Sequence, residues 1–416
     1  MMLNKKVSYK VPRNLLVLFE LMALLLLFVY DRENIDKFTL VSGISLIFMI
    51  YISNFILLRI STGDNYIFLI VTMLISIGVV MIYRIDSTLG MKQVIWAGMG
   101  ITIFFITYLL VKRIKGWENW ANLYVIASIG LFLMTLILGT RKKGSINWIQ
   151  LGRFSFQPTE IIKILMIFLI SAYYTNYEIY KEKKYGSYYL MGIIYVFIGF
   201  LFLQRDLGTV LIFYTIFLAL QFIYEENRKL ILYNVLFFTI SGIAGFFLFD
   251  HVRVRFEIWI NPWKYIDNKG YQITQSLFAI ATGGFFGTGI GRGHPDFIPE
   301  VHTDFIFSAI CEEMGIFTGI GIIMLFLILV YRGFKIAINQ RNKFFRIVAL
   351  GISILFGIQS FIIFGGVLKM IPLTGITIPF VSYGGSSMIS SFIALGILQV
   401  ASEELDVEEK DYGEGA

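Results

Sequence analysis

Long, uninterrupted apolar blocks dominate the chain, and 15–30 and 322–331 are two examples. A bilayer core about 30 Å thick is crossed by a helix of roughly 20 apolar residues. Helices and closed barrels are the structures that satisfy their backbone hydrogen bonds in lipid. Because the apolar runs do not alternate, we interpret them as helices and predict an all-α, polytopic membrane protein. The pattern predicts twelve spans, at 14–30, 38–58, 66–83, 93–111, 121–138, 158–174, 188–203, 207–224, 231–249, 305–331, 348–367 and 382–400.

The composition agrees with a membrane protein. Only 15% of the residues are charged, 57% are hydrophobic, and the mean hydropathy is +0.75. A soluble domain carries roughly 25% charged residues, so too few remain to coat a soluble surface. In a soluble chain the net charge of +7 would point to nucleic acid. In this chain it indicates anionic membrane lipids and basic cytoplasmic loops instead. The single cysteine, Cys311, excludes an intramolecular disulfide.

Lys and Arg are distributed unequally between the predicted loops. An even number of spans places both termini on one side, and the loops of that side hold 19 Lys and Arg residues. The short loops of the other side hold 6. Because basic loops stay in the cytoplasm, we expect both termini to be cytoplasmic. This arrangement makes 402–416 a cytoplasmic acidic tail.

Two loops on the predicted outer side, 139–157 and 250–304, break this rule. Between them they carry nine cations: Arg141, Lys142, Lys143, Arg153, Arg253, Arg255, Lys264, Lys269 and Arg292. An anionic ligand that collects at this face would explain them. Long, folded loops also cross the membrane whatever their charge, and the sequence leaves both explanations open.

The segment around Pro158 predicts the start of a helix that carries charged residues into the membrane. Proline at the first helical position and an acid in the first turn are typical of a helix N-terminus. Glu160 and Lys163 are three residues apart and share a helix face. Because the apolar run continues beyond them, Lys163 should lie about one turn inside the membrane. An intramembrane lysine indicates a functional site, although an ion pair with Glu160 could equally be structural.

Three further segments combine polar residues with Gly or Pro. Asp206 follows a tight turn between two spans, where an acid can simply cap the next helix. The stretch 283–293 is rich in glycine, which either cradles phosphate or lets backbone segments pack closely. The nearby Glu300, His302 and Asp304 do not have a diagnostic metal-site spacing. Prolines and glycines also interrupt 371–387, and broken segments at membrane depth usually line a cavity or pack against protein.

Together and in order, the motifs resemble the SEDS family of FtsW, RodA and SpoVE. They are Gly-Ser-Ile-Asn-Trp-Ile at 144–149, Glu-Ile-Ile-Lys at 160–163, Asp-Leu-Gly-Thr at 206–209, Gly-Tyr-Gln-Ile-Thr-Gln-Ser at 270–276, His-Thr-Asp-Phe at 302–305, Glu-Glu-Met-Gly at 312–315 and Pro-Phe-Val-Ser-Tyr-Gly-Gly at 379–385. The resemblance covers about residues 121–400 and implies a ten-helix family core preceded by two additional N-terminal helices. We expect N-terminal transmembrane helices at 1–120 and the catalytic membrane core, including the loop 250–304, at 121–401.

The resemblance implies a membrane enzyme that polymerises lipid II into peptidoglycan strands for elongation, division or sporulation. It also implies a class B penicillin-binding protein as partner, and location in the bacterial cell membrane. The implied catalytic residues are Glu160, Lys163 and a carboxylate of the long loop. Cations would neutralise the diphosphate leaving group, with or without Mg²⁺ or Mn²⁺, and no dedicated protein metal site is expected. The implied substrate-binding residues are Lys142, Arg153, Asp206, Gln272, Gln275, His302 and Asp304.

The chain departs from the family pattern at the expected general base. The family has an aspartate two residues after the tryptophan of Asn-Pro-Trp, and this position is Tyr265 here. A tyrosine, with a reference pKa near 10, is a poor base at neutral pH. Either Asp267 acts as the base through a shifted loop, or polymerase activity is weak or absent. The second case leaves a flippase for the same lipid, or a non-catalytic scaffold for the penicillin-binding protein. Arg205, where the family often has proline, and Asn147, where it often has arginine, are smaller departures.

Overall fold

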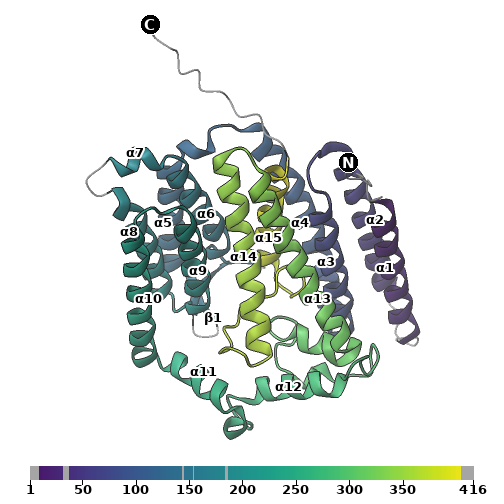
Figure 1. Ribbon diagram of the computed structural model, residues 1–416. Coiled ribbons are helices and arrows are strands. Elements are labelled where there is room, and N and C mark those ends of the chain that lie inside the picture. Colours follow the sequence, from purple (N-terminus) through teal and green to yellow (C-terminus); the bar gives the residue numbers. More distant parts are fainter. Residues whose placement is uncertain (1–8, 31–36, 143–144, 153, 183–185, 404–416) are drawn as a thin grey trace, which may run out of the picture.

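The computed structural model is a bundle of long helices with irregular segments at one end (Figure 1). It describes residues 9–30, 37–142, 145–152, 154–182 and 186–403. Each predicted span coincides with a helix: α1 (Lys10–Tyr30), α2 (Lys37–Ile60), α3 (Tyr66–Ile85), α4 (Ser87–Arg113), α5 (Ala121–Leu138), α6 (Thr159–Thr175), α8 (Gly186–Leu203), α9 (Leu207–Tyr224), α10 (Arg228–Leu248), α13 (Ile306–Asn339), α14 (Lys343–Val367) and α15 (Gly385–Ala401).

Within the described part of the chain, eight of these helices are long and apolar enough to cross a membrane. They are α2, α3, α4, α5, α9, α10, α13 and α14. Helices α6 and α15 have 17 residues each and pack inside the bundle. The predicted all-α polytopic membrane protein is therefore confirmed.

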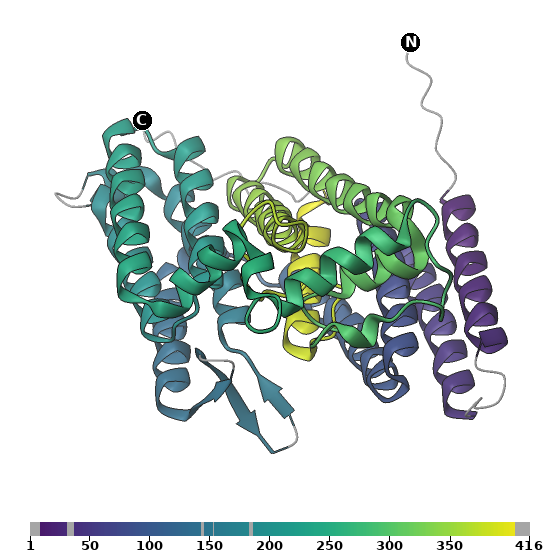
Figure 2. The same cartoon turned by 90° about the horizontal axis from the view of Figure 1, so that it is seen from below.

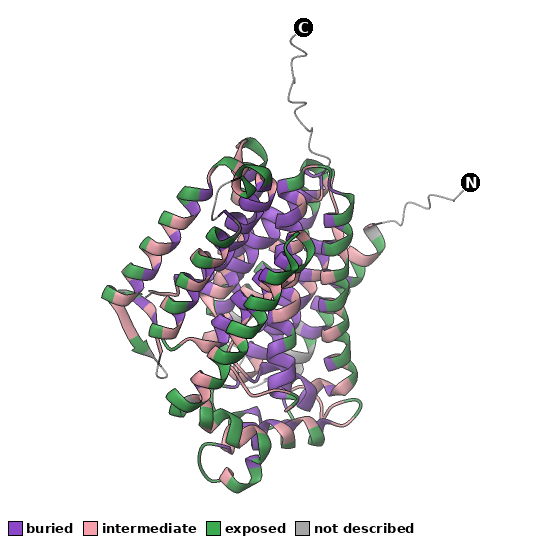
Figure 3. Cartoon of the chain, turned by 60° about the vertical axis from the view of Figure 1, so that its left-hand side comes forward, coloured by how far each residue is buried: buried purple, intermediate pink, exposed green. Residues whose placement is uncertain are grey.

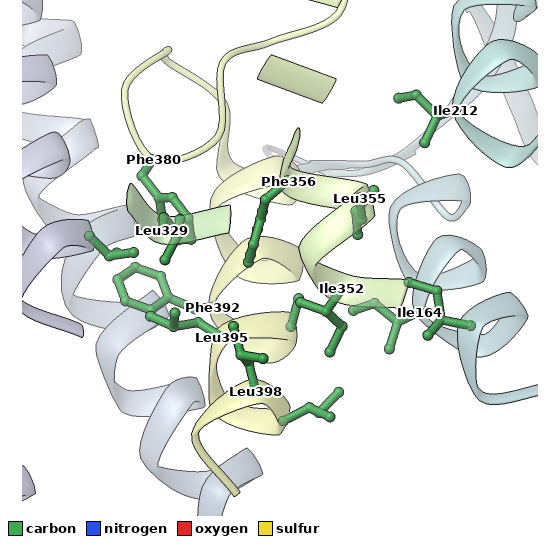
Figure 4. Packing of buried hydrophobic residues seen from close by; sticks show 14 of the residues in the cluster. Ile164, Ile212, Leu329, Ile352, Leu355, Phe356, Phe380, Phe392, Leu395 and Leu398 are labelled. Atoms are coloured by element: carbon green, nitrogen blue, oxygen red, sulfur yellow. The ribbon is translucent and has the colours of Figure 1, made fainter. Parts of the chain in front are cut away.

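The core lies between α14, α15 and the helices around them, and the exposed residues lie on the periphery (Figure 3). Three phenylalanines connect α14 with α15. The Phe380 ring centroid lies 5.5 Å from that of Phe356 and 5.6 Å from that of Phe392. Leu395 and Leu398 extend the same cluster along α15 (Figure 4). Because lipid solvates apolar side chains, the outer helices can leave theirs uncovered, as α1 does with Leu15, Leu18 and Leu21.

We call the end of the bundle that carries residues 139–157 and 250–304 the loop face. The first of these segments forms a small antiparallel sheet of β1 (Gly139–Lys142), β2 (Ser145–Leu151) and β3 (Phe154–Phe156), in the order β1-β2-β3. Ile149 pairs with Phe156 in its register. The second segment holds α11 (Asp250–Ile260), η2 (Pro262–Tyr265), α12 (Tyr271–Gly283) and η3 (Pro295–Phe297). Figure 2 shows α11 and α12 crossing beneath the bundle, with the sheet at one edge. The sheet was not predicted from the sequence.

The glycine-rich segment 283–293 packs backbone against backbone on the start of α13. The amide of Thr288 donates to the Glu312 carbonyl at 2.9 Å, and the amide of Ile316 donates to the Gly284 carbonyl at 2.9 Å. Gly315 interrupts the helix with φ 84°, in the left-handed region that favours glycine. A Cβ at Gly315 would collide with the carbonyl oxygen of Phe285. Close packing thus accounts for these glycines, and none of 283–293 lines the cavity described below.

The opposite end of the bundle, which we call the terminal face, includes the start of α1 and the end of α15. A buried carboxylate, Glu403, joins α15 to the helices beside it. It pairs with the Lys112 ammonium at 2.7 Å and accepts hydrogen bonds from Tyr108 at 2.7 Å and Ser61 at 2.8 Å. The two remaining short helices, η1 (Trp117–Asn119) and α7 (Tyr177–Lys181), connect longer ones.

Candidate functional site

A cavity of about 1150 Å³ opens among the segments of the loop face. Its walls come from β2, α6, the start of α9, α11, α12 and the segments 302–304 and 373–387. The charged side chains that line it are Glu160, Lys163, Arg205, Asp206, Arg255, Lys269 and Asp304. Residues more than 200 positions apart in the chain therefore share one cavity. Residues 373–377, 383–385 and Ser387 of the interrupted segment contribute to the cavity wall, which favours cavity lining, one of the two explanations that the sequence left open.

The α6 wall contains the predicted Glu160 and Lys163. The helix begins at Thr159 after Pro158, so both side chains lie in its first two turns. The Lys163 Nζ atom lies 2.9 Å from Glu160 Oε1, and the two residues are only 3% and 8% exposed. Lys163 also donates to Gln359 Oε1 at 3.4 Å, and the Ser390 hydroxyl donates to Glu160 Oε2 at 2.6 Å. The ion pair is thus fixed in orientation and borders the cavity instead of facing lipid.

Asp206 both caps a helix and lines the cavity. Its Oδ1 atom accepts the amide of Thr209 at 3.1 Å, which is the predicted cap of α9. Its Oδ2 atom accepts hydrogen bonds from the side-chain amides of Asn147 at 2.9 Å and Gln157 at 3.5 Å. The sheet, the start of α6 and the start of α9 therefore meet at this carboxylate. Asp206 is therefore both the cap of α9 and a carboxylate of the cavity wall.

Arg255 projects from α11 into the cavity between two carboxylates. Its Nη1 atom donates to the Thr374 carbonyl at 2.9 Å. Burial lowers the pKa of Arg255, and the negative charges of Asp206 and Asp304, which raise it, offset this effect only in part. Arginine stays protonated at any physiological pH, so this position supplies a permanent cation. A Cβ at Gly375 would lie 3.6 Å from Asp304 Oδ2 and 3.9 Å from Arg255 Nη2, so both charged groups lie beside this glycine.

The segment 302–304 is held firmly against the 378–384 loop. The amide of Tyr383 donates to the His302 carbonyl at 2.9 Å, and the Ser382 hydroxyl donates to the Thr303 carbonyl at 2.6 Å. His302 and Asp304, which the resemblance implies as substrate-binding residues, line the cavity. Gln272 also lines it, whereas Gln275 is not among the lining residues.

Asp267 and Tyr265 are not part of the cavity wall. Asp267 is exposed, and neither residue is among those that line the cavity. The Tyr265 hydroxyl donates to Glu257 Oε2 at 3.3 Å. Glu257 lies on the face of α11 that is turned away from the cavity-lining Arg255. The structure thus brings Glu160 and Lys163 together but does not add the Asp267 carboxylate to them.

The cations of the segment 139–157 are Arg141, Lys142, Lys143 and Arg153. Arg153 and Lys143 lie outside the described residues, and the side chain of Lys142 is not described. Arg141 is exposed and does not line the cavity.

The donor groups of the cavity do not form a metal site of their own. Among the residues that the structure describes, no group of three or more His, Cys, Asp or Glu side chains is placed to hold a metal ion. The His302 Nε2 atom lies 3.8 Å from Glu300 Oε2, which makes a weak pair. The described side chains therefore do not fit a protein-held Mg²⁺ or Mn²⁺.

Three cavity-lining cations were not predicted as site residues: Arg205, Arg255 and Lys269. Arg255 and Lys269 belong to the surplus of positive charge in the loop 250–304, and this surplus was the available signal. The sequence could not tell which of the loop cations turn inward, because the direction of each depends on how α11 and α12 pack. The signal for Arg205 was its departure from the family pattern, which often has proline at this position.

Comparisons with known proteins identify the family. Residues 64–406 match the family described as cell cycle protein, which comprises FtsW, RodA and SpoVE. The chain is 33% identical over 358 residues to the peptidoglycan glycosyltransferase RodA of Mycobacterium tuberculosis, covering 79% of this chain and 76% of that one. It is 32% identical over 359 residues to the stage V sporulation protein E of Bacillus subtilis, covering 81% and 96%.

The fold is also that of solved structures. A chain from a study titled structural coordination of polymerization and crosslinking by a peptidoglycan synthase complex superposes with a TM-score of 0.68 at 23% identity. The match covers 82% of this chain and 97% of that one. The family match begins at residue 64, so α1 and α2 lie outside it. On this evidence of sequence and fold, the chain is a member of the SEDS family of FtsW, RodA and SpoVE.

Proposed function

We propose that the chain is a peptidoglycan glycosyltransferase that polymerises lipid II at the loop face. The observation that carries this proposal is the cavity itself, which combines fixed cations with carboxylates beside the membrane. Lys163 lies on one wall and Arg255 on another, with Asp304 next to Arg255. Relatives of about one-third identity are named peptidoglycan glycosyltransferases, which supports the same reaction class.

Each group would have a distinct role in an inverting transfer. The oxygen of the acceptor sugar hydroxyl attacks the donor anomeric carbon, and the bond from that carbon to the diphosphate breaks. Lys163 and Arg255 stabilise the negative charge that develops on the departing undecaprenyl diphosphate. A carboxylate accepts the hydroxyl proton as general base. Glu160 holds Lys163 in place and is a positioning residue.

Two carboxylates are candidates for the general base. Asp304 already lies on the cavity wall beside Arg255. Asp267 would reach the cavity only if the turn 266–270 rearranged. That movement would break the hydrogen bonds from the amides of Asn268 and Gly270 to the Tyr265 carbonyl, at 3.1 and 2.9 Å.

The proposal includes an orientation and a partner. Positive charge on the loops of the terminal face supports cytoplasmic termini in a bacterial cell membrane, with the loop face outside. Lipid II, membrane lipids and a class B penicillin-binding protein would then meet the chain at or beside this face. The partner rests on the resemblance and on the similar fold of a chain from a peptidoglycan synthase complex.

The substitution at Tyr265 supports a second candidate, a flippase or scaffold without polymerase activity. Proteoliposomes that contain labelled lipid II, with and without a class B penicillin-binding protein, separate these functions. Glycan polymer made by the chain supports the enzyme. Movement of the lipid headgroup across the bilayer without polymer would support a flippase. Polymer that appears only in the Tyr265→Asp variant would indicate a degenerate enzyme that serves as a scaffold.

A further inference from the structure

We propose that Arg205 binds a phosphate group of the lipid-linked substrate in the cavity. This inference rests on the proposed function for the identity of the ligand. Four observations support it: the position of Arg205, its backbone conformation, its lack of a partner among the described residues, and the charge of the surrounding walls.

Arg205 occupies a position that ordinarily belongs to glycine. At the end of α8, the amide of Asp206 donates to the Leu201 carbonyl and the amide of Arg205 donates to the Phe202 carbonyl, both at 3.0 Å. These two bonds form a Schellman motif, in which the residue after the C-cap is left-handed and usually Gly. Arg205 adopts this conformation with φ 60°. A side chain at this site costs backbone free energy that glycine would not, so its presence calls for another role.

The side chain of Arg205 is available to a ligand. It is exposed to the cavity and lines its wall. Within the described part of the chain, its guanidinium forms neither an ion pair nor a hydrogen bond. By contrast, Lys163 is paired with Glu160, and Arg255 lies between Asp206 and Asp304.

The charge of the walls favours an anion at this position. Among the described residues, four cations and three carboxylates line the cavity, which leaves one net positive charge. Removal of Arg205 would cancel this net charge. A guanidinium can donate two parallel hydrogen bonds to phosphate oxygens, so a diphosphate matches both the charge and the donors of Arg205.

Lys369 provides a matched control because it repeats the same local structure outside the cavity. At the end of α14, the amide of Met370 donates to the Gly365 carbonyl and the amide of Lys369 donates to the Gly366 carbonyl. Lys369 is left-handed with φ 59°, and it does not line the cavity. A cation at a helix C-terminus also complements the helix dipole. If the dipole alone explains Arg205, the Arg205→Gly and Lys369→Gly variants should behave alike.

The test measures binding of lipid II to the full-length protein in nanodiscs of neutral lipid. Both glycine variants should melt at or above the parent temperature, because both relieve left-handed strain. Arg205→Gly should raise the Kd for lipid II by at least about tenfold, the lower limit for loss of one hydrogen bond to a charged group. Lys369→Gly should leave the Kd unchanged. Arg205→Lys should retain part of the affinity, because it keeps the charge but loses the paired donors.

Further arms identify the source of the phosphate. Undecaprenyl diphosphate should compete with lipid II for the parent and less effectively for Arg205→Gly. If the effect of Arg205→Gly appears only when phosphatidylglycerol is in the nanodisc, Arg205 binds a lipid headgroup and the diphosphate assignment is overturned. Equal Kd values for parent and Arg205→Gly, or equal losses in the two glycine variants, also overturn it. If Arg205→Gly weakens binding but the parent makes no polymer, only the proposed function fails.

Discussion

Replacement of Lys163 by Met separates the stability of the buried ion pair from its role in the reaction. The Lys163 Nζ atom lies 2.9 Å from Glu160 Oε1, and neither residue is more than 8% exposed. Loss of the ammonium would leave a buried carboxylate whose remaining hydrogen-bond partner, among the described residues, is the Ser390 hydroxyl. Removal of one member of such a pair costs about 3–5 kcal/mol. We therefore expect Lys163→Met to melt clearly below the parent in detergent.

The double variant Glu160→Gln/Lys163→Met supplies the control. Replacement of both charges by neutral groups of similar size is often neutral or stabilising, so the double variant should regain most of the lost stability. Neither variant should polymerise lipid II, because the cation that stabilises the leaving diphosphate is absent from both. Thermal unfolding and polymerisation are measured on the same preparations. A Lys163→Met protein as stable as the parent, or a double variant as unstable as the single one, would refute the assignment of a desolvated pair.

Three other changes follow from the geometry. Asp304→Asn should abolish polymerisation of labelled lipid II and Asp267→Asn should not, because Asp304, unlike Asp267, lines the cavity. The reverse result would mean that the 266–270 turn moves. Burial raises the pKa of Glu403, but hydrogen bonds led by Lys112 outweigh it and lower the pKa overall. Glu403 therefore stabilises the fold at pH values above its unfolded pKa of about 4.3, and this stability is lost as the pH falls through the folded pKa. Glu403→Gln should lower the melting temperature at pH 7 and reduce its dependence on acid, and an unchanged acid profile would contradict this. Gly315→Ala should reduce the yield of folded protein in fluorescence-detected chromatography, because the new Cβ meets a backbone carbonyl at a left-handed position; a normal yield would show that the contact relaxes.

The hydrophobic pattern predicted the membrane-spanning helices because each of them needs a continuous run of apolar residues along its own length. The same local logic identified Asp206, whose cap on α9 depends only on the residues that follow it. Glu160 and Lys163 were paired by their spacing along one helix. These features depend on neighbours in the sequence, and the structure confirms them.

Features that depend on distant packing were less accessible. In β2, polar and apolar residues alternate over much of Ser145–Leu151, but this short strand was not predicted. Arg255 turns into the cavity only because α11 lies beneath the bundle, next to the 373–377 segment. The direction of Asp267 depends on a turn of a few residues. The resemblance supplied the role expected for this position but not the way in which this chain, with Tyr265, arranges it.

The most direct test of the central claim is gel-resolved synthesis of glycan strands from fluorescent lipid II by the purified protein. The measurement compares the parent with the Glu160→Gln/Lys163→Met variant, in the presence of a class B penicillin-binding protein whose own active site is blocked. A ladder of polymer from the parent, absent from the equally folded variant, is the predicted result. No polymer from the parent, or equal polymer from both proteins, would contradict the account of the cavity as a lipid II polymerase site.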